Sequence, residues 1–353
     1  MKNLDLPARI KHGLGRKREA SARLKARFVL KLLGHNLQQQ TELNYLNAES
    51  TSARIIDVSN VSKGFELSFH DSKTGTGFQH TFSSRFLITA SDVIVNSEKS
   101  FIFTADREFL SESSEWPSEQ VLIVNRVPRR DPVNVIDSAK LGLANSGYYH
   151  WLTEDLPSFL NNESRLPVIE YSGSSRRNRE IYDLLSVQTL LVPEWVKVQN
   201  LSFTTRGKDI GYLHPKNLEQ LRRFRSNWVK TPSMESKKLY ISRSKSRRSL
   251  PNESNLENFL QEHDYEIIYA EDFSFLEQLQ LFSQAASIIG PHGAGLTNAI
   301  WADKTRILEI DSAERTNRCF EWQSHVCGHE YTRFSLRGSD LGELISFLRG
   351  WLR

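Results

Sequence analysis

Short apolar runs alternate with segments of helical periodicity in the second half of the chain. Four runs read as strands because they are short and rich in β-branched residues. They are residues 238–242, 266–269, 286–289 and 306–310. Between them the apolar spacing predicts helices beginning near Asn252, at Ser274 and near Leu296, the second with a capping box to Glu277. Such alternation predicts a parallel sheet with helices on its faces, and ligands beyond the carboxyl ends of its strands.

The first half of the chain divides into two patterns. Between residues 52 and 123 most apolar positions alternate with polar ones, and residues 71–77 supply a hairpin turn, so this segment is predicted to be β-rich. From Tyr148 onward strands again alternate with helices, which predicts a second α/β unit. Residues 229–236 contain a proline and two serines and are the expected linker between the halves.

The size and composition fit a globular protein with two domains. The chain has 353 residues, 39% of them hydrophobic. No apolar run approaches the roughly 20 residues that a membrane span requires, and the amino terminus lacks the apolar core of a signal peptide. Two cysteines, Cys319 and Cys327, make no disulfide framework. We therefore expect a cytoplasmic protein.

Positive charge is concentrated in residues 1–36. This segment holds ten Lys or Arg and two acidic residues, a net of +8, whereas the whole chain carries +4. Leu24, Phe28 and Leu32 recur at helical spacing among the basic residues, which predicts a basic amphipathic helix. Such a helix binds an anionic membrane surface or an acidic partner, or packs on its own domain. Nucleic acid is not expected, because the tail has no interleaved aromatic residues.

A glycine-rich turn follows the third strand of the second half. Residues 290–295, here called the glycine turn, read Gly-Pro-His-Gly-Ala-Gly and join a buried strand to a helix. Backbone N–H groups at a helix start attract anions, and glycines let a pyrophosphate approach the main chain. His292 adds a side-chain donor. The alternative is a tight connection whose histidine bonds only to the backbone.

Charged residues are predicted at the same sheet edge. The first strand of the second half runs into a basic loop, residues 243–250, with Arg243, Lys245, Arg247 and Arg248. Guanidinium groups bind phosphate through paired hydrogen bonds, so we expect a phosphate site here; a solvated loop is the alternative. Glu309 ends the fourth strand, where a carboxylate can accept ribose hydroxyls or simply lie on the surface.

A second candidate site lies in the first half. His150 and Glu154 are four residues apart, which places both on one face of a helix, with Asp155 on a different face. An imidazole oriented by a carboxylate is a competent general base for a hydroxyl, and a carboxylate alone also serves. The alternative is a helix with an aromatic core face, at Tyr149 and Trp151, and an incidental surface pair.

Several other chemistries are not favoured by the sequence. The spacing of Cys319, His325, Cys327 and His329 matches no zinc motif, so the cysteines are expected to be buried thiols. The chain has no Walker phosphate loop and no Gly-x-Ser-x-Gly nucleophile elbow, which argues against common ATPases and esterases. It also lacks the Asp-x-Asp pair that holds a divalent metal on a sugar nucleotide, which favours a site without metal.

Three blocks of the sequence together resemble glycosyltransferase family 61. The first is Tyr-Tyr-His-Trp-Leu-Thr-Glu-Asp-Leu-Pro at 148–157. The second is Tyr-Ile-Ser-Arg at 240–243 with Arg247, Arg248 and the Asn-Glu pair at 252–253. The third runs from the Phe-Leu-Glu-Gln of 275–278 through Gly-Pro-His-Gly-Ala-Gly-Leu-Thr-Asn to Leu-Glu-Ile at 308–310. The bacterial, capsular-polysaccharide type of member is the best fit.

The resemblance implies an α/β protein of GT-B type, with two Rossmann-type domains facing across a cleft. It implies inverting, metal-independent transfer from a nucleotide-sugar, commonly a UDP-sugar, to a glycan or lipid-linked glycan. The residues that match its donor side are Arg243, Arg247, Arg248, His292, Gly293, Ala294, Gly295, Asn298 and Glu309. His150 and Glu154 match the acceptor-side block. Gly147 stands where many members have Asn, and Asp155 adjoins Glu154, so the identity of the base stays open.

Four segments follow from these assignments. They are the basic tail at 1–36, a β-rich and α/β acceptor domain at 37–230, a donor domain at 237–335, and a helix at 336–353 that crosses back onto the acceptor domain. No cofactor is expected besides the donor substrate, and a role in surface polysaccharide synthesis is expected at the inner membrane face. A polysaccharide pyruvyltransferase and a non-catalytic sugar- or partner-binding protein are the alternative functions.

Overall fold

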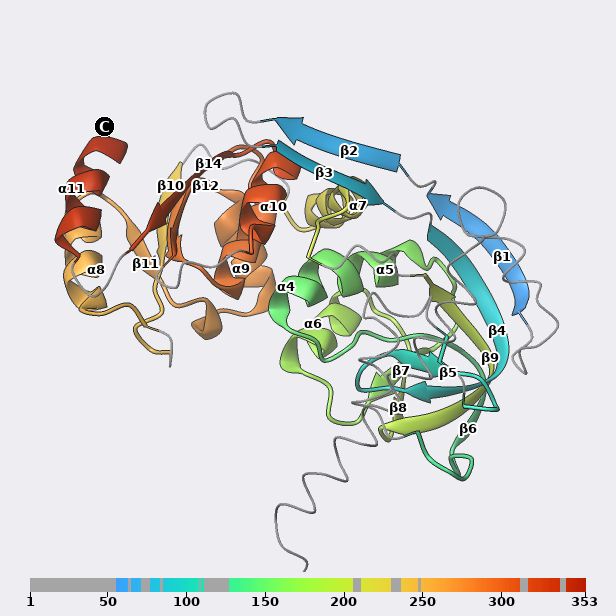
Figure 1. Ribbon diagram of the computed structural model, residues 1–353. Coiled ribbons are helices and arrows are strands. Elements are labelled where there is room, and N and C mark those ends of the chain that lie inside the picture. Colours follow the sequence, from blue (N-terminus) through green and yellow to red (C-terminus); the bar gives the residue numbers. More distant parts are fainter. Residues whose placement is uncertain are drawn as a thin grey trace, which may run out of the picture.

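A computed structural model of the chain shows two large sheets with most of the helices between them (Figure 1). It describes residues 55–62, 65–70, 77–82, 85–107, 109–110, 127–205, 211–229, 236–246, 249–311, 317–336 and 341–353. The predicted basic tail at 1–36, most of the predicted linker, and Arg247 and Arg248 lie outside these residues.

The second half forms a parallel five-stranded sheet in the order β11-β10-β12-β13-β14. Its strands are β10 (Lys237–Ile241), β11 (Glu266–Ile268), β12 (Ala285–Pro291), β13 (Arg306–Asp311) and β14 (Glu330–Ser335). The four predicted strands are confirmed, and β14 is an addition. The chain runs from β10 to β11 on one side and then continues at β12 on the other. A ligand crevice is therefore expected beyond the carboxyl ends of β10 and β12.

The longer helices of this half connect its strands, and the last of them follows β14. They are α8 (Glu253–Gln261), α9 (Phe275–Ser283), the 3-10 helix η4 (Ala294–Trp301), α10 (Cys319–Cys327) and α11 (Gly342–Trp351). The capping box of Ser274 and Glu277 is present at the start of α9. The carboxyl-terminal helix was predicted to cross back onto the acceptor domain, but it stays with the second half. Leu344 and Leu348 of α11 pack in one apolar cluster with Leu256 and Leu260 of α8.

The first half forms a mixed seven-stranded sheet in the order β1-β4-β9-β6-β7-β8, with β5 beside β4. The strands are β1 (Ile55–Ser62), β4 (Arg85–Asn96), β5 (Phe101–Phe103), β6 (Val135–Lys140), β7 (Val168–Tyr171), β8 (Thr189–Val192) and β9 (Trp195–Thr204). Strands β9, β6, β7 and β8 are parallel, whereas β4 runs antiparallel to β1, β5 and β9. The β-rich segment and the α/β unit therefore share one curled sheet (Figure 1). Because this sheet contains antiparallel strands, it differs from the purely parallel sheet of a Rossmann-type domain. The α/β class is confirmed.

The helices of the first half face those of the second. They are α4 (Tyr148–His150), the π-helix η2 (Trp151–Asp155), α5 (Leu156–Asn161), α6 (Arg176–Leu184) and α7 (Pro215–Ser226). A separate hairpin, β2 (Phe65–His70) with β3 (Gly77–Phe82), reaches across both halves: the ring of Phe82 lies 6.0 Å from that of Trp322 in α10. The hairpin thus adds contacts between the two sheets.

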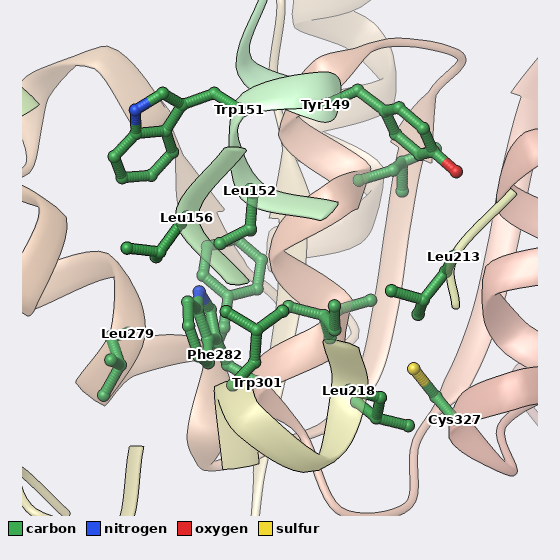
Figure 2. Packing of buried hydrophobic residues seen from close by; sticks show 14 of the residues in the cluster. Tyr149, Trp151, Leu152, Leu156, Leu213, Leu218, Leu279, Phe282, Trp301 and Cys327 are labelled. Carbon is green, nitrogen blue, oxygen red and sulfur yellow. The ribbon is translucent and has the colours of Figure 1, made fainter. Parts of the chain in front are cut away.

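One apolar core joins the two halves. Trp151 and Leu156 of the first half pack with Phe282 and Trp301 of the second, and all four are fully buried (Figure 2). The rings of Trp151 and Phe275 lie 5.4 Å apart and edge to face. Burying a side chain of this size contributes about 1.5–3 kcal/mol. The core therefore holds the two halves together.

Helix α7 begins at a buried histidine. Nδ1 of His214 accepts a hydrogen bond of 3.0 Å from the backbone N–H of Lys216, and the imidazole is wholly buried against Phe82. Burial and the nearby charge of Arg85 lower the pKa of His214 to about 3. The imidazole is therefore neutral in the folded protein down to acidic pH, whereas the unfolded chain takes up a proton near pH 6.5.

This difference predicts acid sensitivity. Between pH 6.5 and 3 the unfolded state binds more protons, so the free energy of unfolding falls as the pH falls, by about 2 kcal/mol from pH 7 to pH 5. His214→Asn retains a capping oxygen and removes the titration. We expect urea denaturation at pH 7 and 5 to show a smaller loss in His214→Asn than in wild type. The surface variant His263→Asn is the control, and equal losses in all three proteins would contradict the assignment.

Candidate functional site

The ends of β10 and β12 bring together the two predicted phosphate-binding segments. Arg243 follows β10, and its Nη1 donates a 2.8 Å hydrogen bond to the carbonyl oxygen of His292. The guanidinium lies across the glycine turn, since a Cβ on Gly293 would stand 2.7 Å from Nη1. A cationic side chain and the start of a helix thus occupy the crevice that the strand order predicts.

Close packing, as well as ligand access, explains the glycines of the turn. A Cβ on Gly290 would lie 3.2 Å from Cβ of Ile241, and one on Gly295 would lie 2.8 Å from Cγ2 of Ile241. The first hydrogen bond of η4 runs from the N–H of Leu296 to the carbonyl of Gly293. The N–H groups of Ala294 and Gly295 precede that bond, so helix geometry gives them no acceptor within η4.

Buried groups fix the imidazole of His292. Nδ1 is hydrogen-bonded to Glu309, and the second carboxylate oxygen of Glu309 accepts a hydrogen bond from the hydroxyl of Tyr331. Glu309 is 1% exposed. The predicted contact of Glu309 with a ribose is therefore corrected: the carboxylate lies beneath His292 and orients it. This arrangement leaves Nε2 as the ring nitrogen for a ligand.

Asn298 also has a different role from the predicted donor contact. Its Oδ1 accepts a 2.6 Å hydrogen bond from the hydroxyl of Tyr148, and its Nδ2 donates a 2.9 Å bond to Gln278. The residue is wholly buried. Its amide joins the first half of the chain to η4 and α9 and supports the turn from behind.

His150 and Glu154 form the predicted pair. Nδ1 of His150 lies 2.9 Å and 3.0 Å from the two carboxylate oxygens of Glu154. The backbone N–H of Gly211 donates to the same carboxylate at 3.2 Å. The side chain of His150 is 29% exposed and that of Glu154 is 6% exposed. The imidazole is thus the accessible member, and Glu154 holds its orientation.

Asp155 faces a different environment. It is 3% exposed, accepts a hydrogen bond from Ser146, and lines a small, partly open pocket between the ends of β6 and β9. Ser158 and Thr204 line the same pocket. A buried carboxylate held in this way fits a structural role better than that of a base. Asp155 ends the π-helix η2, a distortion that is frequent at functional sites.

Aromatic contacts bring the two candidate clusters to the same side of the molecule. The ring of Phe320 lies 5.7 Å from that of Tyr149, which adjoins His150, and 5.2 Å from the imidazole of His292. Tyr148 at the start of α4 is bonded to Asn298 of η4. The arrangement therefore places the His150–Glu154 pair of one half near the glycine turn of the other.

The cysteines behave as predicted from their spacing. Cys319 and Cys327 are free and buried, and burial raises the pKa of each thiol to about 12. Within the described ranges, no three His, Cys, Asp or Glu side chains are grouped as a metal site.

The sequence patterns did not reveal Tyr331 or Phe320. Both act through contacts between distant elements, β14 with β13 and α10 with the glycine turn. Residues 330–335 show no clear alternation that would predict β14, and nothing in them identifies Glu309 as the partner of Tyr331.

Gly293→Ala tests how closely Arg243 lies against the turn. The backbone at Gly293 is extended, with φ of 169°, so alanine is tolerated there, but its Cβ would displace the guanidinium. Displacing one charged donor costs about 1.5–3 kcal/mol, so we expect about tenfold or greater weakening of inorganic pyrophosphate binding by calorimetry. The control is Gly350→Ala, whose Cβ meets nothing within 4 Å. Unchanged affinity in Gly293→Ala would show that Arg243 does not act from this position.

Comparison with known proteins identifies one match. The model of the family Glycosyltransferase 61 matches residues 148–308. No curated protein matches the chain. The matched range includes His150, Glu154, Arg243 and His292, and begins at the residue that bonds to Asn298. None of the helices in the described part of the chain has the length and apolar character of a membrane span.

Proposed function

We propose that this enzyme inverts the anomeric centre of a nucleotide-sugar without a metal ion. The chain belongs to glycosyltransferase family 61 over residues 148–308 and is a glycosyltransferase. The donor is proposed to be a UDP-sugar, and the acceptor a hydroxyl of a glycan or lipid-linked glycan. The observation that carries this proposal is the convergence of Arg243 and His292 at one sheet edge with the His150–Glu154 pair close by.

The glycine turn is suited to the departing nucleoside diphosphate. Arg243 supplies a fixed positive charge, and the N–H groups of Ala294 and Gly295 supply partial positive charge at the start of η4. Nε2 of His292 is held in place by the bond from Nδ1 to Glu309, and in the imidazolium form of the ring it donates to a phosphate oxygen. These groups stabilise the negative charge that grows on the diphosphate as the bond to the sugar breaks.

The acceptor hydroxyl is proposed to lose its proton to His150. Glu154 bonds to Nδ1 and orients the imidazole, and its carboxylate stabilises the imidazolium that forms when the ring accepts the proton. The oxygen attacks C1 of the sugar from the face opposite the diphosphate, so a single displacement inverts the configuration. The two halves would then hold acceptor and donor in the manner of a GT-B enzyme.

Turnover of a nucleotide-sugar panel tests the proposal. The purified chain is incubated with UDP-, GDP-, ADP- and CMP-sugars, with and without glycan acceptors and with or without EDTA. We expect release of nucleoside diphosphate from a UDP-sugar, undiminished by EDTA, and a product of inverted configuration by NMR. Retained configuration would contradict the single displacement. Thermal stabilisation by phosphoenolpyruvate and by no nucleotide-sugar would point to pyruvyl transfer.

The location of the enzyme is a separate proposal. We propose that residues 1–36 attract the cytoplasmic enzyme to anionic lipid, where surface or capsular polysaccharide is made, because that segment carries a net charge of +8. Co-sedimentation with vesicles containing phosphatidylglycerol should decrease when residues 1–36 are deleted and should be weakened by salt. Equal co-sedimentation of the full and shortened chains would refute it.

A further inference from the structure

A single buried carboxylate holds both ends of the basic loop. Glu253, the first residue of α8, is 3% exposed. Its Oε1 accepts a 2.7 Å hydrogen bond from the backbone N–H of Arg243 and a 2.8 Å bond from the hydroxyl of Tyr240. Its Oε2 accepts a 3.0 Å bond from the backbone N–H of Leu250. The carboxylate therefore joins the first and last residues of the loop at 243–250.

These hydrogen bonds are stronger than bonds between neutral groups, because their acceptor is a carboxylate. A buried carboxylate is costly unless its lone pairs are used, and hydrogen bonds to a charged acceptor contribute about 1.5–3 kcal/mol each. Tyr240 is itself fully buried in β10, so the carboxylate is tied to the sheet as well as to the loop. The neighbouring Ser242 adds a longer contact, 3.4 Å from its Oγ to Oε1.

The effect reaches the phosphate-binding side chain through the main chain. Fixing the backbone N–H of Arg243 sets the direction in which its side chain leaves the loop. That side chain passes over Gly293 and bonds to the carbonyl of His292, on the opposite side of the crevice. Glu253 lies behind the loop, with its carboxylate fully engaged by protein groups.

We propose that Glu253 is a positioning residue for the donor diphosphate: its carboxylate sets the diphosphate affinity through Arg243 without touching the ligand. The inference rests on the proposed function, since it assumes that the crevice binds the diphosphate of the donor. It adds a residue whose role follows from the loop geometry alone. The negative charge of Glu253 is stabilised by the hydroxyl of Tyr240 and the backbone N–H groups of Arg243 and Leu250.

Glu253→Gln is the most direct variant. The amide oxygen can replace Oε1, but the amide nitrogen then faces the N–H of Leu250, and two donors cannot bond to one another. The loop should open at its Leu250 end, and Arg243 would then be held by a hydrogen bond to a neutral amide oxygen, which is weaker than one to a carboxylate. Glu257→Gln is a matched control one turn along α8, because that carboxylate bonds to the side chains of Ser242 and Tyr269.

Calorimetric titration with inorganic pyrophosphate measures the effect. We expect Glu253→Gln to bind about tenfold more weakly than wild type, as the loss of one charged hydrogen bond predicts. Glu257→Gln should bind as wild type does. Tyr240→Phe, which removes one donor and keeps the carboxylate, should weaken binding about threefold, and it tests the proposal even if Glu253→Gln does not fold.

A double-mutant cycle separates positioning from a general loss of structure. If Glu253 acts through Arg243, the Arg243→Ala, Glu253→Gln double variant should bind pyrophosphate as weakly as Arg243→Ala and no more weakly. Additive losses, or wild-type affinity in Glu253→Gln, would overturn the inference. Wild-type protein that binds neither pyrophosphate nor UDP would instead overturn the proposed donor site. The two failures are thus distinguished by the wild-type titration.

Discussion

Arg243→Ala is expected to lower kcat/KM for the nucleotide-sugar by about 10²–10³-fold, the loss typical when one charge-stabilising donor is removed. The guanidinium lies at the crevice between β10 and β12 and is held there by the carbonyl of His292. Its charge is of most use as the diphosphate departs, so we expect kcat to fall more than KM rises. Initial rates of nucleotide release over a range of donor concentrations measure both.

Arg306→Ala is the matched control for this prediction. Arg306 belongs to the same sheet but begins β13, at the opposite edge, where its Nη2 bonds to the carbonyl of Trp351. It should retain wild-type turnover. If Arg243→Ala turned over the donor at the rate of Arg306→Ala, the diphosphate site would be assigned to the wrong residues.

The second large effect is expected at His150. His150→Ala should lower kcat by about 10²–10⁴-fold, the range that general-base catalysis contributes. Donor binding should be unchanged, because the imidazole is proposed to act on the acceptor and not on the donor. Glu154→Gln should lower kcat by less, since the amide keeps one acceptor for Nδ1 but cannot stabilise an imidazolium ion. Single-turnover rates with saturating donor and acceptor report the chemical step.

Asp155→Asn separates the alternatives for the base. Because Asp155 is 3% exposed and bonded to Ser146, its substitution should reduce the melting temperature and leave most of the turnover of the folded protein. A loss of turnover in Asp155→Asn equal to that in His150→Ala, at unchanged stability, would transfer the role of base to Asp155.

Local patterns were sufficient to predict four of the five strands of the second sheet and the glycine turn. Strands β10, β11, β12 and β13 have short apolar runs, and the glycine turn and the capping box of α9 are features of neighbouring residues. The position of His150 one helical turn from Glu154 likewise depends on four residues of sequence. These features are readable because the interactions that form them are close in the chain.

Long-range pairing was not predictable in the same way. Strand β4 joins β9 across about a hundred residues, and no local pattern identifies that partner. Glu309 and Asn298 were expected to contact the ligand, but their positions become clear only when Tyr331 and Tyr148 are placed beside them. An acidic or amide side chain looks the same in sequence whether it meets substrate or supports a residue that does.

The apolar core between the halves has a consequence for the catalytic cycle. Swinging the halves apart would expose Trp151, Phe275 and Trp301, each now at most 3% exposed, at a cost of about 1.5–3 kcal/mol per side chain. A conformation that costs about 5.5 kcal/mol is populated about once in 10⁴ molecules. Wide hinge opening is therefore too rare to be a routine step of turnover. Substrates should instead enter and leave past surface loops. The distance between the His150–Glu154 pair and the glycine turn should stay the same throughout turnover.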